Sequence, residues 1–198
     1  MGMDKTSLGD RMKNHESVFK HKLVSRMPVV IRLDGKAFHT YTRQCDKPFD
    51  QDLHDIRSKT LDYLCKSIQG CIIGYSQSDE ITLVLKDYMT FNTCAWFDNQ
   101  VQKIVSISAS MCSSYWNSLV ASDNKYKDKF KGLAFFDSRV FNVPQEDVVN
   151  CLLWRQQDWE RNSIQMLARS LYSQKQCHGV SCKDLVTKVE NEHGIIWG

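Results

Sequence analysis

Apolar and polar residues alternate along the chain in blocks that predict helices and strands in turn. Residues 28–33, PVVIRL, form a short apolar and β-branched run, which is typical of a buried strand. Residues 71–75 and 81–85 are two similar runs on either side of SQSDE, so they predict a hairpin. Apolar residues at helical spacing predict helices over 50–68, 97–120 and 145–174, and a weaker polar helix over 6–25. A last strand-like stretch, over 133–136 and 140–143, precedes the final helix.

The order of these segments indicates a single α+β domain. Strands are few and helices stand between them, so we expect a small, mostly antiparallel sheet with helices packed on it. A chain of 198 residues is long enough to bury a core of its own without disulfides. Its 42% hydrophobic and 25% charged residues are ordinary for a globular protein and exclude wholesale disorder.

Signals of export or membrane insertion are absent from the sequence. No stretch approaches the roughly 18 consecutive apolar residues of a spanning helix, and the first twenty residues have no apolar segment of a signal peptide. We therefore expect a cytoplasmic protein that has no membrane partner and whose eight cysteines are reduced thiols. Only Cys177 and Cys182 lie close together, so we expect no zinc site. The net charge of +3 permits a nucleic-acid partner without requiring one.

Two acidic positions are the first candidates for chemistry. Asp34 follows the first predicted strand, and Asp79 lies in the predicted hairpin turn beside Glu80. If strand 28–33 pairs with the hairpin, both carboxylates meet at one edge of the sheet, where they suit Mg²⁺ and substrate phosphates. Gly35 follows Asp34 and lets the backbone approach a ligand closely. The alternative interpretation is that both aspartates are ordinary turn residues.

Basic and aromatic residues accompany these carboxylates. Lys36, Arg43 and Lys47 follow Asp34 in one loop, which suits a triphosphate but equally a solvated basic loop. On the last predicted helix, Arg155 and Asn162 are seven residues apart and share a face. That face suits an RNA partner, or else belongs to a surface helix with a buried tryptophan.

Five motifs, in this order along the chain, resemble the tRNA-His guanylyltransferase family, and more narrowly its guanylyltransferase-like branch of 3′-to-5′ RNA polymerases. They are RLDGKAFH (32–39), KPFD (47–50), GYSQSDE (74–80), FDSRV (136–140) and WRQQD (154–158). The resemblance implies a palm-like (ferredoxin-like) α+β fold, as in polymerase and cyclase catalytic domains. It implies one catalytic domain over residues 1–198, with a core at about 5–143 and a helical C-terminal part at about 144–198 that contacts RNA.

Site residues follow from the same resemblance. It implies that Asp34, Asp79 and the carbonyl of Gly35 hold two Mg²⁺ ions, and that Glu80 is a further catalytic carboxylate. It also implies that Arg155 and Asn162 approach the RNA end. The nucleotide-binding residues that it implies are Asp34, Gly35, Lys36, Ala37, Phe38, His39, Lys47, Ser78, Asp79 and Lys103.

The reaction that the resemblance implies builds RNA at its 5′ end. ATP converts the 5′-monophosphate of a tRNA into a 5′-adenylylated end. The 3′-hydroxyl of an incoming GTP or other nucleoside triphosphate then attacks that phosphate and displaces AMP. The resemblance further implies a homotetramer. Two hypotheses from other classes stay open at this point: a nucleotide cyclase on the same palm, and an RNA-binding protein without catalysis.

Two departures from the family pattern refine this expectation. Eukaryotic guanylyltransferases carry a HINNLYN-type segment after WRQAD, whereas residues 160–166 here are ERNSIQM and keep only the first of its asparagines. This difference favours template-dependent repair of tRNA 5′ ends over the addition of a single G to tRNA-His. Family members also continue past the final GIIWG, so we expect a natural short form or a truncated chain, with weaker tetramer contacts.

Overall fold

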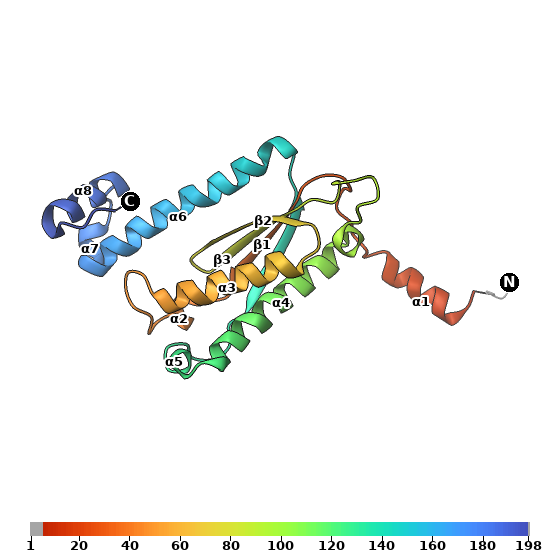
Figure 1. The fold of residues 1–198 in the computed structure, drawn as a ribbon, viewed down its shortest axis with the longest axis horizontal. Coiled ribbons are helices and arrows are strands. Elements are labelled where there is room, and N and C mark those ends of the chain that lie inside the picture. The colour runs from red at the N-terminus through yellow and green to blue at the C-terminus, as the bar shows by residue number, and fades with distance from the viewer. Residues whose placement is uncertain (1–5, 198) are drawn as a thin grey trace.

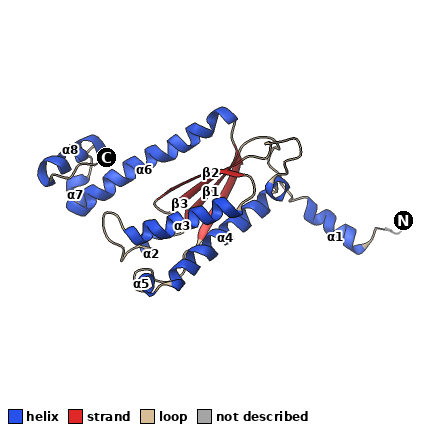
Figure 2. Ribbon diagram, in the orientation of Figure 1, coloured by secondary structure: helices blue, strands red, loops and turns tan. Residues whose placement is uncertain are grey.

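The computed structural model describes residues 6–197, which form a four-stranded antiparallel sheet with helices on both faces (Figure 1, Figure 2). The strands are β1 (Val29–Gly35), β2 (Cys71–Gln77), β3 (Glu80–Leu85) and β4 (Phe136–Asn142), in the order β2-β3-β1-β4. β2 and β3 form the predicted hairpin, and β1 pairs with β3 on one side and with β4 on the other. The predicted α+β class with a small antiparallel sheet is confirmed.

One face of the sheet is apolar, because alternate side chains of a strand point to the same side. Ile31 and Leu33 of β1 lie opposite Leu83 and Ile81 of β3, and all four are fully buried. Helices α3 (Gln51–Ser67) and α4 (Val101–Ser122) cover this face (Figure 1). Their apolar stripes complete the main core with Ile56, Leu64, Ile104, Cys112 and Trp116.

An aromatic cluster closes this core at the end of β1. The short helix α2 (Phe38–Tyr41) directs Phe38 inward, and its ring centroid lies 5.0 Å from that of Phe136 and 5.4 Å from that of Trp116. Trp116 Nε1 donates a hydrogen bond to the hydroxyl of Tyr41 at 3.2 Å. The cluster anchors the start of the loop that follows Asp34.

The long helix α6 (Val148–Leu171) lies over the opposite face of the sheet (Figure 1). Helices α7 (Gln174–Cys177) and α8 (Cys182–His193) fold back onto its C-terminal half. Ala168, Cys177 and Leu185 form a second, small apolar cluster there. The shorter connecting elements are η1 (Trp96–Asn99) before α4, α5 (Asn124–Lys127) after it, and η2 (Gln145–Asp147) before α6.

Some predicted boundaries are wrong. The helix predicted over 6–25 is α1 (Leu8–Ser17), which buries no side chain and projects from the body (Figure 1). It ends early because none of its side chains packs on the core, and packing supplies most of the stability of a helix. The following segment is held in extended form, with Leu23 N donating to Asn99 O at 2.9 Å. β4 runs without interruption through residues 137–139, because each of these residues pairs with β1. No helix within residues 6–197 combines the length and apolarity needed to cross a membrane.

Gly74 of β2 allows α3 to pack closely against the sheet. A Cβ at this position would overlap Sγ of Cys65 and lie 2.8 Å from Cδ1 of Leu61. We expect Gly74→Ala to lower the free energy of unfolding by about 1–3 kcal/mol, because those side chains must move. Urea unfolding measures the change. Gly9→Ala on the exposed helix α1 is the control and should not lower the midpoint. Equal midpoints for wild type and Gly74→Ala would contradict the close packing.

Candidate active site

Strand pairing brings the two predicted aspartates together. Asp34 of β1 lies opposite Glu80 of β3 on one side and opposite Asp137 of β4 on the other. Ser78 and Asp79 form the turn between β2 and β3, and the carbonyl of Asp79 accepts a hydrogen bond from Gly35 N at 3.1 Å. The hairpin turn and the end of β1 therefore share one edge of the sheet.

Asp79 is a partly buried carboxylate with little compensation. Burial raises its pKa above the ordinary aspartate value, and the charge of Asp34 raises it further, while hydrogen bonds from its own backbone and from Ser78 oppose the rise. Among residues 6–197, no cationic side chain forms an ion pair with Asp79. Asp34 has one distant partner, Arg139, whose Nη2 lies 3.7 Å from its carboxylate. Two adjacent carboxylates whose negative charge is so weakly neutralised by the protein favour binding of a cation.

The donor set fits a hard divalent cation. Mg²⁺ uses few protein carboxylates and keeps positions for water and substrate phosphates. Asp34 and Asp79 meet that requirement, and the carbonyl of Gly35 as a third ligand stays a prediction. Within the described part of the chain, no group of three or more His, Cys, Asp or Glu side chains is arranged to hold a metal. The protein alone therefore offers an open site rather than a closed cage.

These carboxylates line a cavity of about 790 Å³ bounded by the polar face of the sheet, the loop before α3, α3 and α6. This volume is in the usual range for small-molecule sites. We call it the active-site cavity. The predicted site residues that line it are Asp34, Lys47, Ser78, Asp79, Glu80, Arg155 and Asn162.

A buried ion pair joins the sheet to α6 across this cavity. Arg155 Nε donates to Glu80 Oε1 at 2.6 Å, and Arg155 Nη2 donates to Asp158 Oδ2 at 2.9 Å. The side chains of Arg155 and Glu80 are only 9% and 11% exposed. The guanidinium also packs on the ring of Trp154, 4.3 Å from its centroid. The pair positions α6 over the sheet, whereas RNA contact by Arg155 and catalysis by Glu80 stay predictions.

Lys129 fixes the far end of the loop that follows Asp34. Its Nζ lies 2.9 Å from a carboxylate oxygen of Asp50 and 2.8 Å from one of Asp52. Asp50 also caps α3 by accepting from Leu53 N at 3.0 Å. Burial would raise the pKa of Asp50, but the hydrogen bonds from Leu53 and Lys129 hold it below the usual range. This anchoring fixes the segment that carries Lys47 in the cavity wall.

The other predicted nucleotide-binding residues lie outside this cavity. Lys36 and Ala37 are exposed on the loop beside it, and His39 is exposed on α2. The side chain of Phe38 is buried in the aromatic cluster. Lys103 is exposed on the first turn of α4. The part of α4 level with the end of β1 is marked by Ser113 in the middle of the helix, whose hydroxyl accepts from the N–H of Phe136, the residue paired with Gly35. Lys103 precedes Ser113 by ten residues, about 15 Å along the helix. The structure therefore does not bring Lys103 to Asp34, and its role stays a prediction.

Sequence reasoning missed two arginines in the cavity wall. Arg32 and Arg57 both line the cavity, and each has a buried Nε without a partner among the described residues. Arg57 Nη1 donates to the carbonyl of Ser78 at 3.3 Å, and burial lowers the pKa of Arg57. The sequence pattern does contain a signal for both arginines. Arg32 stands between Ile31 and Leu33, so it must face away from the core, and Arg57 is four residues from both Leu53 and Leu61 on an apolar helix face.

Comparison with known proteins identifies the family of this chain. The sequence model of the tRNAHis guanylyltransferase (Thg1) family matches residues 9–144. The chain belongs to the Thg1 family. The resemblance that rests on the RLDG and SDE motifs is thereby confirmed.

The chain is also similar to individual curated proteins. The chain is 29% identical to the uncharacterized protein R259 of Acanthamoeba polyphaga mimivirus, over 96% of this chain and 72% of that protein. It is also 29% identical to a protein of Dictyostelium discoideum named as a probable tRNA(His) guanylyltransferase, over 72% of this chain and 54% of that one. The chain thus spans about half the length of that guanylyltransferase.

Solved structures of the Thg1 family superimpose closely on this fold. A bacterial Thg1-like protein in complex with ATP is 45% identical, with a TM-score of 0.91 over 96% of this chain and 82% of that chain. A bacterial Thg1-like protein in complex with GTP is 46% identical, with a TM-score of 0.79 over 84% of this chain and 77% of that one. The tRNA(His) guanylyltransferase of Saccharomyces cerevisiae, at 22% identity and a TM-score of 0.71, supports the fold.

The partly buried charge of Asp79 predicts a pH-dependent stability. Because its pKa is raised in the folded protein, the folded state binds more protons than the unfolded state between the ordinary and the raised pKa. Stability should therefore fall as the pH rises through this window. Asp79→Asn removes the charge, so in EDTA at neutral pH it should be more stable than wild type.

Urea unfolding of both proteins in EDTA, from acid to neutral pH, tests this prediction. The advantage of Asp79→Asn over wild type should shrink as the pH falls below the ordinary carboxyl range, because Asp79 is then protonated in both states. A difference that is the same at every pH would contradict a partly buried, charged Asp79.

The buried ion pair predicts a second stability effect. Glu80→Gln should lower the free energy of unfolding by about 2–3 kcal/mol, because Arg155 keeps its buried charge with only Asp158 as a partner. Arg161→Gln is the matched control, since it removes an exposed ion pair to the same Asp158. The control should lower the free energy of unfolding by less than about 1 kcal/mol. Equal losses for the two variants would show that burial adds nothing to the pair.

Proposed function

We propose that this chain is a nucleotidyltransferase that adds nucleotides to the 5′ end of tRNA in the 3′-to-5′ direction. The observation that carries this proposal is the pair Asp34 and Asp79, adjacent and poorly compensated, in a cavity of about 790 Å³. Phosphoryl transfer requires mainly positioned charges that neutralise phosphates and hold the reacting groups in line. Membership of the Thg1 family and the ATP and GTP complexes of its bacterial members support this assignment.

Asp34 and Asp79, with the carbonyl of Gly35, would hold two Mg²⁺ ions. When bound, these ions would neutralise phosphate charge and make a coordinated hydroxyl a better nucleophile. The protein supplies the orientation of the two carboxylates through the β1–β3 pairing. Glu80 would contribute by holding α6 over this edge through Arg155.

The loop after Asp34 is suited to the phosphates of ATP and of the incoming GTP or other nucleoside triphosphate. The amides of Gly35 and Lys36 donate to Asp79 O and Phe135 O inside the fold. Those of Ala37, Phe38 and His39 have no acceptor among residues 6–197, so they are available to phosphate oxygens. The side chains that would add charge or hydrogen-bond donors are Lys36, Lys47, Ser78, Arg32 and Arg57. Lys103 would contribute only if α4 brought it closer to Asp34 than it does in this structure.

We propose that the helical part, residues 144–198, receives the tRNA end as part of the same catalytic domain. Asn162 of α6 lines the cavity, and the ring of Trp154 is half exposed beside it. Aromatic rings of this kind stack on unpaired bases. Residues 160–166, with a single asparagine, favour template-dependent repair, and the addition of a single G to tRNA-His is the alternative.

We also propose that the protein acts as a homotetramer in the cytoplasm. Helix α1 buries none of its residues. Leu8, Met12, Val18 and Phe19, on and just after this helix, are each more than half exposed. Clustered apolar side chains of this kind usually mark an interface, and a second copy of the chain would bury them.

The decisive assay uses a tRNA that lacks its first 5′ nucleotide and carries a labelled 5′-monophosphate. It is incubated with ATP, all four nucleoside triphosphates and Mg²⁺, and the base opposite the gap is varied. We expect addition of the nucleotide that pairs with the opposing base. Asp79→Asn should lower the rate more than about 100-fold, since it removes a charge at the reacting phosphate. Asp62→Asn, on the exposed side of α3, is the control and should leave the rate unchanged.

Two other outcomes would change the proposal. Addition of G whatever the opposing base would identify a guanylyltransferase of the single-G type. Failure to extend even a tRNA with a 5′-triphosphate end would contradict the proposed function.

A further inference from the structure

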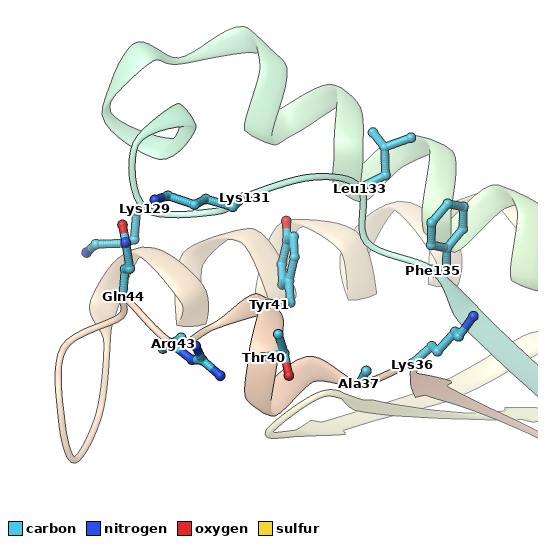
Figure 3. Close-up of a pocket in the computed structure, with 10 residues that line it drawn as sticks. All are labelled: Lys36, Ala37, Thr40, Tyr41, Arg43, Gln44, Lys129, Lys131, Leu133 and Phe135. Carbon is cyan, nitrogen blue, oxygen red and sulfur yellow. The ribbon is translucent and has the colours of Figure 1, made fainter.

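A second hollow lies on the other side of the loop that follows Asp34, with a volume of about 440 Å³. Its walls are the segment 36–44 and the segment 129–135 that leads into β4 (Figure 3). It shares no lining residue with the active-site cavity. We call it the basic groove and define it by Lys36, Tyr41, Arg43, Lys131, Leu133 and Phe135.

Positive charge in the basic groove is largely uncompensated. No carboxylate lines it in the part of the chain that the structure describes. Lys129, which also reaches it, is paired with Asp50 and Asp52. Lys36, Arg43 and Lys131, in contrast, form no ion pair among residues 6–197. Three such cations around one hollow favour an anionic occupant.

An exposed aromatic ring on a rigid segment lines the same groove, beside Lys36 (Figure 3). Phe135 is 55% exposed and the neighbouring Leu133 is 65% exposed. The backbone on both sides of Phe135 is fixed to α4, because Asn117 bonds to the N–H and C=O of Ala134 and Ser113 accepts from Phe136 N. Lys36 N donates to the carbonyl of Phe135 at 2.8 Å, which joins the two walls. The ring is therefore held in solvent rather than folded into the core.

A rigid aromatic ring flanked by uncompensated cations is the arrangement that recognises single-stranded nucleic acid. The ring stacks on an unpaired base, and the cations contact the phosphates on either side of it. A base inside a duplex could not stack on the ring in this way, since both of its faces are covered by neighbouring bases. Figure 3 shows Lys36 beside Phe135, and Lys36 is two residues from Asp34, so the groove adjoins the site of reaction.

We propose that the basic groove binds an unpaired segment of the RNA substrate, with one base on Phe135 and its phosphates on Arg43 and Lys131. This inference rests on the proposed function, because it assumes an RNA substrate. It adds a second contact that distinguishes an RNA with a single-stranded tail from a blunt duplex. The groove would thereby orient the acceptor end before its 5′ phosphate enters the active-site cavity.

The test compares two RNA stem-loops with the same duplex, one with a single-stranded 3′ tail and one blunt. Binding is measured by fluorescence anisotropy, without nucleotides. Phe135→Ala should weaken binding of the tailed RNA by roughly tenfold to a hundredfold and leave the blunt RNA unchanged. The double variant Arg43→Gln/Lys131→Gln should reduce the slope of log affinity against log salt by about 1.4 for the tailed RNA. Lys127→Gln, an exposed lysine of α5 outside the groove, is the control.

Two results would overturn the proposal. One is equal weakening of tailed and blunt RNA by Phe135→Ala, which would indicate a general effect on the fold. The other is loss of ATP binding, measured by calorimetry, in Arg43→Gln/Lys131→Gln, which would make the groove a nucleotide site. Because binding is measured without catalysis, a failure here is distinguishable from a failure of the 5′-extension assay.

Discussion

The buried ion pair between Glu80 and Arg155 sets the distance between the sheet and α6, and the active-site cavity is the space between them. Polar and charged side chains occupy both surfaces, so the two layers do not collapse into an apolar core as the opposite face does. This pair, with Asp158 as a second partner of Arg155, holds them at this separation together with a hydrogen bond from the Tyr75 hydroxyl of β2 to Gln156 Oε1 at 2.8 Å. The same burial that strengthens this pair also excludes water from Asp79 and raises its pKa.

The cavity contains carboxylates of two kinds. Asp34 and Asp79 form a poorly compensated negative centre, and Arg32, Arg57 and Lys47 stand in the wall. The other carboxylates of the wall each pair with Lys129 or Arg155: Asp46, Asp50, Glu80 and Asp158. A complex of a divalent cation with a triphosphate has the complementary arrangement, with its cation at the centre and its anionic oxygens outside. The unpartnered Nε atoms of Arg32 and Arg57 agree with this arrangement, since they are buried donors without an acceptor among residues 6–197.

Much of this arrangement could be predicted from sequence, because it depends on local patterns. The β-branched run before Asp34 and the hairpin around Asp79 predict strands, and antiparallel pairing then brings the two aspartates to one edge. Residues whose position depends on tertiary packing could not be placed in this way. Lys129 meets Asp50 and Asp52 from a segment 77 residues or more away in the chain. The helix predicted over 6–25 ends at Ser17 in the structure, since packing decides where a polar helix ends.

The central claim is that Asp34 and Asp79 hold the metal ions and the nucleotide phosphates. Crystals grown with ATP and Mn²⁺, with diffraction recorded at the manganese absorption edge, test it most directly. Our account predicts anomalous density within about 2–2.5 Å of both carboxylates, at the distance of a first-row or hard-metal oxygen contact, and ATP phosphates facing Lys47. Manganese away from both aspartates, or ATP phosphates lying in the basic groove instead of the active-site cavity, would contradict it.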